Sequence, residues 1–176
     1  MILWLNGTFG VGKTTASAGL AASLESLRQF DPEWVGYMLA NNLADMHVAD
    51  FQEYPSWRRL VPVVADEIVS ATAQNLVAAQ SVLVEEYWRE LTGGLVDLGH
   101  EVFHVVLDAD ADSLHARIDA DGVEPEHIRP WRHRHVDMYQ AARTWLIDSA
   151  DLVVDTVSLD ASATATYIHA AIAARL

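Results

Sequence analysis

The chain begins with the stretch MILWLNGTFGVGKTT (residues 1–15), in which a short apolar run is followed by a glycine-rich turn and a Lys-Thr pair. From Gly7 to Thr14 the turn fits the pattern Gly-x-x-x-x-Gly-Lys-Ser/Thr, between an expected strand and an expected helix. Glycines let backbone N–H groups turn inward around phosphate oxygens, and a helix N-terminus favours an anion. The stretch therefore predicts a phosphate-binding loop, the Walker A motif. The alternative is a glycine-rich turn without a ligand.

Each residue type in this loop has an expected role toward ATP and Mg²⁺. Lys13, the only lysine of the chain, is expected to reach the β- and γ-phosphates and to act in catalysis. The Thr14 hydroxyl is the expected Mg²⁺ ligand. The residues expected to bind the nucleotide are Gly7, Thr8, Gly10, Val11, Gly12, Lys13, Thr14 and Thr15.

Beyond the loop, short apolar runs alternate with longer segments of helical spacing. The expected strands are Ile2–Leu5, Arg28–Phe30, Val82–Val84, Val102–Leu107 and Leu152–Val154. The expected helices are Lys13–Leu27, Pro55–Ala79, Tyr87–Leu98, Ala111–Ala120, Trp131–Ile147 and Ala161–Ala174. This alternation predicts an α/β fold with a parallel sheet, helices on both faces, and ligands beyond the carboxyl ends of the strands.

Length, charge and cysteine content exclude several classes of protein. The 176 residues suit a single domain spanning 1–176. A formal charge of −14 repels phosphate backbones, so nucleic acid is not an expected partner. Without cysteine there is no disulfide, thiolate nucleophile or cysteine metal site. No uncharged run reaches the roughly 18 apolar residues of a membrane span, and a cytoplasmic location is expected.

Within the P-loop class, the sequence favours phosphoryl transfer to a small molecule. A guanine-nucleotide switch needs an Asn/Thr-Lys-x-Asp element, and no lysine follows Lys13. Residues 121–134 form an expected insertion containing Arg129, Arg132 and Arg134, and Arg117 precedes it on a helix. A mobile lid with arginines would surround the transferred phosphoryl group and exclude water, with Arg117 and Arg132 as the candidate catalytic cations. The alternative is an exposed loop whose arginines balance nearby acids.

Acids and aromatic residues after the other strands suggest the acceptor side. Asp31 follows the second expected strand and is the candidate base for an acceptor hydroxyl, or else the N-cap of a helix that begins near Pro32. Trp34 is a candidate for stacking on a substrate ring. Glu85 and Glu86, read as the end of the third strand, either hold Mg²⁺ through water or position the nucleophile, with Glu85 as a candidate substrate contact. The alternative is two solvated acids at a helix start.

Three segments carry a resemblance to a known family. They are residues 1–14, the Asp31-Pro-Glu sequence with Gly36, and Asp50-Phe-Gln-Glu-Tyr-Pro-Ser-Trp-Arg58. Together they resemble the tunicamycin resistance proteins over about the first third of the chain. Beyond Arg59, the pattern of strands, helices and lid resembles the wider family that includes the chloramphenicol phosphotransferase-like kinases.

The resemblance implies an ATP-binding protein with the P-loop kinase fold and the strand order 2-3-1-4-5. It also implies resistance to a uridine-containing antibiotic, with phosphorylation of the drug as the natural mechanism. Carried over by residue, Asp31 would face the acceptor, and Gln52, Tyr54 and Arg58 would line its pocket. A hydrophobic start to the following helix explains Tyr54 and its neighbours equally well.

The leading hypothesis is an ATP- and Mg²⁺-dependent phosphotransferase with a small-molecule acceptor. The alternative is a nucleotide-dependent protein that sequesters a ligand without chemistry. The oligomeric state and the identity of the acceptor are left open.

Overall fold

β1 (Ile2–Asn6) is the middle strand of a five-stranded parallel sheet with the order β2-β3-β1-β4-β5. The other strands are β2 (Leu27–Phe30), β3 (Asn75–Ala79), β4 (Val102–Asp108) and β5 (Leu152–Asp155). Leu3 lies opposite Val77 on one side and Phe103 on the other. The computed structural model describes residues 1–175 and confirms the predicted fold class and strand order.

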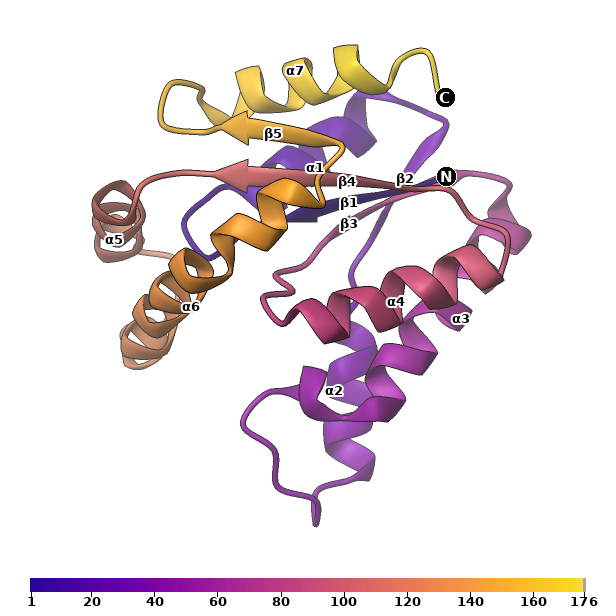
Figure 1. Cartoon of the computed structure of the whole chain (residues 1–176), viewed down its shortest axis with the longest axis horizontal. Coiled ribbons are helices and arrows are strands. Elements are labelled where there is room, and N and C mark those ends of the chain that lie inside the picture. The colour runs from indigo at the N-terminus through magenta and orange to yellow at the C-terminus, as the bar shows by residue number, and fades with distance from the viewer. Residues whose placement is uncertain (176) are drawn as a thin grey trace.

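Seven α-helices connect and cover these strands in the described part of the chain (Figure 1). They are α1 (Lys13–Ser23), α2 (Glu33–Asn42), α3 (Pro55–Thr72), α4 (Glu85–Asp97), α5 (Ala111–Ala120), α6 (Arg129–Asp148) and α7 (Ala161–Ile172). Two short 3-10 helices are η1 (Phe51–Glu53) and η2 (Glu126–Ile128). The arrows of β4 and β5 point toward α5 and the start of α6, which therefore lie at the carboxyl edge of the sheet (Figure 1).

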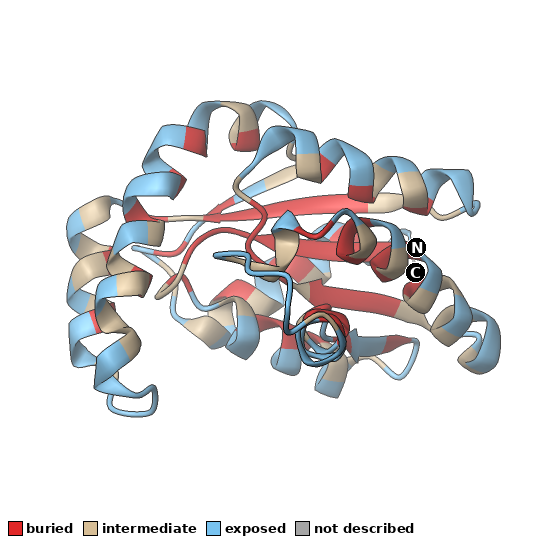
Figure 2. Ribbon diagram, turned by 90° about the horizontal axis from the view of Figure 1, so that it is seen from below, coloured by how far each residue is buried: buried red, intermediate tan, exposed pale blue. Residues whose placement is uncertain are grey.

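The alternation of side chains along β1 divides the core into two layers. Leu3 and Leu5 pack with apolar residues of α1, α5, α6 and α7. Ile2 and Trp4 pack with apolar residues of α2, α3 and α4. All five residues of β1 are fully buried, and red strands run through the centre of the ribbon with exposed helix faces outside (Figure 2). Burial on both faces is what a central parallel strand requires, which explains its unbroken apolar sequence.

The third strand does not lie where the sequence predicts it. The expected strand Val82–Val84 has no strand structure, and the expected helix Pro55–Ala79 ends at Thr72, so that its last residues form β3 instead. Ala73 ends the helix in a left-handed conformation with φ 56°, although neither glycine nor proline marks the break. Pairing of Leu76 with both Ile2 and Arg28 fixes the strand from outside its own sequence.

Two further features of the described residues bear on the site. Residues 121–125, η2 and the first turns of α6 occupy the range predicted as a lid. Among residues 1–175, no helix combines the length and apolar character that crossing a membrane demands.

Candidate active site

The glycine-rich loop between β1 and α1 depends on glycine for its shape. Gly7, Gly10 and Gly12 have φ values of 134°, 78° and 93°, in the left-handed range that other residues rarely adopt. A Cβ on Gly7 would also lie 2.6 Å from the Leu107 carbonyl oxygen of β4. The loop is therefore held closely against the sheet at its first glycine. Gly12 is exposed where α1 begins.

Asn6 fixes the start of this loop, and the sequence analysis missed it. The side chain is fully buried, and its Oδ1 accepts hydrogen bonds from Gly7 N (2.8 Å) and Val82 N (2.9 Å). Its Nδ2 donates to the Val82 carbonyl at 3.1 Å. One amide thus ties the loop to the segment after β3 and satisfies three buried backbone groups. Its position as the last residue of the strand before Gly7 was the available signal.

Lys13 lies folded back over its own loop. Its Nζ donates to the Thr8 carbonyl at 2.8 Å and lies 5.5 Å from the centre of the Phe9 ring. Burial lowers the pKa of Lys13 to about 7, the charge of Glu33 opposes this, and the charge of Arg132 adds to it. A dianionic phosphate bound beside Lys13 would stabilise the charged ammonium group, because it supplies a negative charge in place of the water that burial removes.

Arg132 brings a second cation to the loop from α6. The side chain is 7% exposed, its Nη1 pairs with Asp121 Oδ2 at 2.8 Å, and its guanidinium lies 5.7 Å from the Phe9 ring centre. Its Nε is buried with no hydrogen-bond partner among residues 1–175. The Thr8 hydroxyl also donates to the His135 carbonyl of α6 at 3.0 Å. The start of α6 therefore covers the loop, whereas Arg134 points into solvent.

Arg117 brings a third cation to the loop, from α5. Its Nη1 donates to the Gly10 carbonyl (3.3 Å) and to Thr156 Oγ1 (3.1 Å), and its Nη2 donates to the Thr156 carbonyl (2.6 Å). A pocket of about 250 Å³ adjoins these contacts. Its lining includes Gly10, Gly12, Arg117, Thr156 and Asp160. The pocket thus lies between the loop and the segment that follows β5.

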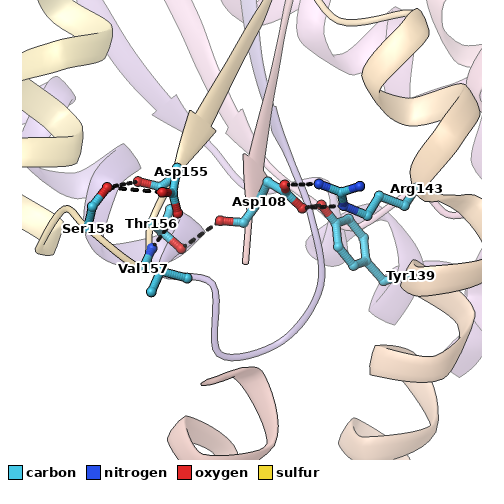
Figure 3. Close-up of polar contacts among 7 residues, drawn as sticks. All are labelled: Asp108, Tyr139, Arg143, Asp155, Thr156, Val157 and Ser158. Carbon is cyan, nitrogen blue, oxygen red and sulfur yellow. Dashed lines mark hydrogen bonds and ion pairs between the residues drawn. The ribbon is translucent and has the colours of Figure 1, made fainter. Parts of the chain in front are cut away.

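Asp108 joins three elements at the carboxyl edge of the sheet (Figure 3). Its carboxylate accepts hydrogen bonds from Tyr139 Oη (2.6 Å) and from Arg143 Nε and Nη2 (2.9 and 2.6 Å). Its carbonyl accepts from Thr156 N (2.9 Å) and Thr156 Oγ1 (3.1 Å). Burial raises the pKa of Asp108, but the hydrogen bonds from Arg143 and Tyr139 outweigh this and hold the pKa below its ordinary value. We call Asp108, Tyr139 and Arg143 the α6 clip.

Asp31 lies at the start of α2, across β3 from the loop. Its Oδ1 accepts the N–H of Glu33 at 2.9 Å, as in the capping alternative, and the residue is exposed. Trp34 follows with 70% of its surface exposed and packs edge-on against Tyr37 at 5.9 Å. Position 36 needs a glycine because a Cβ there would lie 2.5 Å from the Phe51 ring of η1. Asp31 and Trp34 are thus available to a molecule bound beside α2.

The three predicted pocket residues around η1 make internal contacts. Gln52 Nε2 donates to the Ser81 carbonyl at 2.9 Å, which links η1 to the segment after β3. Tyr54 is 4% exposed and its hydroxyl donates to the Met46 carbonyl at 2.7 Å. Arg58 is buried, pairs with Glu90 at 2.7 Å and donates to the Gln52 carbonyl. These contacts fix the 46–58 segment, and contact with an acceptor stays a prediction.

Glu85 and Glu86 do not end the third strand, contrary to the sequence interpretation. Both are exposed in the first turn of α4, and Glu85 pairs with Arg89 one turn later. The residues that directly follow β3 are Gln80 and Ser81, both buried. Because β3 ends at Ala79, a neutral amide stands where the prediction placed an acid. Gln80 Oε1 has no hydrogen-bond partner among the described residues.

Comparisons with known proteins place this geometry in a fold family. No protein-family model matches the chain, and no curated protein matches it either. Among solved structures, the Deinococcus radiodurans tunicamycin resistance protein is similar with a TM-score of 0.76 and 28% identity, covering 97% of this chain and 94% of that one. The fold is that of the P-loop kinases. The resemblance expected from the first 58 residues is thereby confirmed over nearly the whole chain.

Two kinases share this fold at lower identity. A sugar kinase from a Janibacter species has a TM-score of 0.66 at 18% identity, covering 96% of this chain and 92% of that one. The Mycobacterium tuberculosis APS kinase, solved with AMPPNP and APS, has a TM-score of 0.63 at 19% identity, with coverages of 98% and 96%. At these identities the similarity shows the P-loop kinase fold alone.

A P-loop kinase fold implies Mg²⁺ beside the loop, and the donors present fit it in a limited way. Thr14 is exposed at the start of α1, and its hydroxyl makes no hydrogen bond within residues 1–175. No group of three or more His, Asp or Glu residues that could hold a metal occurs in that range. Mg²⁺ accepts such a site because it keeps several waters and takes phosphate oxygens as ligands. Thr14 is accordingly the protein ligand that the geometry offers.

Proposed function

We propose that this protein is an ATP- and Mg²⁺-dependent phosphotransferase that acts on a hydroxyl group of a small molecule. The observation that carries the proposal is the convergence of Lys13, Arg117 and Arg132, from three elements, on one glycine-rich loop. Exposed carboxyl and aromatic groups at the start of α2 follow the carboxyl end of β2, which lies at the same edge of the parallel sheet as the loop. Cations on one side and carboxylates on the other are what transfer of a phosphoryl group to a hydroxyl requires.

The loop and the two arginines would bind the phosphates of ATP. Backbone N–H groups of residues 7–14 and the N-terminus of α1 would hold phosphate oxygens, with Lys13 on the β- and γ-phosphates. Arg132, held over the loop by its pair with Asp121, would bring a positive charge to the transferred group. Mg²⁺, when bound, would neutralise phosphate charge beside Thr14.

The nucleotide base would enter the pocket beside Arg117. Its volume of about 250 Å³ and its place between the loop and the β5–α7 segment support this. The Arg117 guanidinium donates three hydrogen bonds to Gly10 and Thr156. These bonds hold it in place before any ligand binds. A fixed planar cation offers a surface on which an aromatic base stacks.

The acceptor would lie beside α2, where a carboxylate orients its hydroxyl. Asp31 is the residue that the sequence predicts for this task, and Trp34 is exposed enough to stack on a ring. The 28% identity to a tunicamycin resistance protein supports a nucleoside antibiotic as the acceptor. A cytoplasmic location, where ATP and Mg²⁺ are abundant, fits this proposal.

A second candidate function is sequestration of a ligand under the control of nucleotide binding. The observation that favours it is Gln80, because a neutral amide after β3 supplies no charge to a metal or a nucleophile. In this case the protein would bind ATP and the small molecule without converting either.

One experiment separates the two functions. Purified protein is incubated with MgATP and a panel of tunicamycin, other nucleosides, aminoglycosides and sugars, and ADP release is paired with mass analysis of each compound. A transferase gives acceptor-dependent ADP and a product heavier by one phosphoryl group, and Lys13→Ala abolishes both. Binding of ATP and a panel compound without ADP or product, at stoichiometric protein, would refute the phosphotransferase and leave sequestration.

A further inference from the structure

Two histidines on neighbouring helices face each other where α5 packs against α6. The Nδ1 atoms of His115 on α5 and His133 on α6 lie 2.6 Å apart, and their ring centres lie 4.8 Å apart. Asp119 follows His115 by four residues, and its Oδ1 lies 2.9 Å from the Nε2 atom of His133. Residues four apart share one face of a helix, so α5 presents an imidazole and a carboxylate together to the same histidine of α6.

The carboxylate of Asp119 determines which nitrogen of His133 carries a proton. An ionised carboxylate only accepts hydrogen bonds, so the Nε2 atom of His133 is the donor in this contact. In neutral His133 the Nδ1 atom then has a free lone pair, which is directed at the Nδ1 atom of His115. His115 can carry its own proton on Nε2, which makes no hydrogen bond or ion pair within residues 1–175. In that state both Nδ1 atoms offer lone pairs to the same point.

This pair of imidazoles is accessible to solvent and is held in position. The side chain of His133 is 28% exposed, that of Asp119 is 62% exposed, and His115 is half-buried. An ion can therefore reach the Nδ1 atoms and keep water molecules as further ligands. A carboxylate that accepts the second N–H of a histidine ring, as Asp119 does, is the usual partner of a metal-bound histidine.

We propose that His115 and His133 bind a divalent transition metal ion through their Nδ1 atoms, with Asp119 as the positioning residue behind His133. Imidazole nitrogens bind nickel, copper and zinc, whereas Mg²⁺ prefers oxygen ligands, so this site differs in chemistry from the Mg²⁺ site expected beside the loop. The two imidazoles are the protein ligands, and water completes the coordination. A bound ion would join α5, which carries Arg117, to α6, which carries Arg132.

The distance between the two nitrogens favours an ion with right angles between its ligands. Two bonds of about 2.0 Å at a right angle place their nitrogens about 2.8 Å apart, whereas a tetrahedral angle places them about 3.3 Å apart. The observed distance of 2.6 Å is closer to the first value. The site therefore fits Ni²⁺ or Cu²⁺, which form square-planar and tetragonal complexes with nitrogen ligands, better than Zn²⁺.

Calorimetric titration of the untagged protein with Ni²⁺ tests this site and needs neither ATP nor an acceptor. The tightest binding event should have one Ni²⁺ per chain, should be tighter than that of Zn²⁺, and should be unaffected by Mg²⁺. His115→Gln and His133→Gln should each lose this event. The matched control is His127→Gln, an exposed histidine of the nearby η2, and its affinity for Ni²⁺ should equal that of the wild type.

A further variant separates the ligands from the residue that positions them. Asp119→Ala should keep the binding of one Ni²⁺ per chain but lower its affinity about 10- to 100-fold. In protein labelled with ¹⁵N-histidine, Ni²⁺ should broaden the Nδ1 signals of His115 and His133 before those of the other histidines. Thermal unfolding without metal verifies that each variant is folded, so that a misfolded protein is not mistaken for a lost ligand.

Three results would overturn the proposal. Absence of a binding event with one Ni²⁺ per wild-type chain would leave the contact between His115 and His133 as a hydrogen bond between two helices. Undiminished binding in both histidine variants would place the ion elsewhere. Tighter binding of Zn²⁺ than of Ni²⁺ would contradict the right-angle geometry. None of these results bears on the proposed phosphotransferase, because the measurement contains no nucleotide.

Discussion

At the scale of single residues, His104 is the buried group with the most unfavourable chemistry in the core. The residue is 2% exposed, its ring lies 4.1 Å from that of Trp88, and its Nδ1 lies 3.2 Å from the Ser149 carbonyl. Its Nε2 is buried with no partner among the described residues. Burial lowers the pKa of His104 to about 4, against the opposing effects of Ser149 and Asp151. Protonation would place an N–H in apolar surroundings with nothing to accept it.

This residue should make the protein sensitive to acid. Because the pKa of His104 is lower in the folded state than its ordinary value of 6.5, the unfolded state binds the proton more tightly. The contribution to stability is complete above about pH 6.5 and is lost progressively as the pH falls toward 4, to a total of roughly 3 kcal/mol. Denaturant unfolding between pH 4 and 7 should show a shallower pH dependence for His104→Gln than for the wild type. The exposed His47→Gln is the control, and an equal slope for wild type and His104→Gln would contradict the argument.

At the scale of elements, the α6 clip fixes the helix that carries Arg132 to the sheet. Arg143 is about half exposed, so solvent screening limits its bidentate pair with Asp108 to about 1 kcal/mol. Arg143→Met, which keeps an apolar stem, should lower the melting temperature by about 2–4 °C at pH 6. Since the pKa of Asp108 is held below its ordinary 3.8, this difference should shrink as the pH falls through that range.

Calorimetry of Arg143→Met at pH 6 and pH 3 checks this prediction. The control is Arg134→Met on the same helix, where the arginine is exposed and makes no ion pair within the described chain, and its melting temperature should match the wild type. A difference between Arg143→Met and wild type that is the same at both pH values would contradict the role given to the ionised Asp108.

The elements also show which part of the fold the sequence determines locally. β1 and β4 are apolar runs with clear polar or glycine boundaries, and the predicted ranges agree with the structure to within a residue at each end. β3 was missed because Asn-Leu-Val-Ala-Ala tolerates a helix, whereas Val82–Val84 has the composition of a strand. Only pairing with β1 and β2 selects the observed strand, and that information lies far away in the chain.

At the scale of the whole molecule, the site consists of a part that is contiguous in sequence and a part that is assembled by the fold. The loop from Gly7 to Thr14 was predictable because its spacing and glycines act locally. Asn6 and the α6 clip were not, since their roles depend on contacts with residues tens of positions away. The acidic overall charge gave no indication of them, although three cations gather at the loop.

This assembly predicts that nucleotide binding stabilises the molecule as a whole. The loop, α5 and α6 come from distant parts of the chain, and a bound ATP that contacts all three would favour the folded state by mass action. At a concentration 100 times its Kd, ATP should add about 2.7 kcal/mol to the free energy of unfolding, which corresponds to a rise of roughly 5–10 °C in melting temperature.

The variant Arg132→Met should show a smaller rise with ATP. Its effect on the unliganded protein should be small, beyond the loss of the pair with Asp121. Differential scanning fluorimetry with MgATP, and with MgCl₂ alone as the control, measures the effect. An unchanged melting temperature at saturating MgATP would contradict nucleotide binding at this loop, and with it every role assigned to the cations around it.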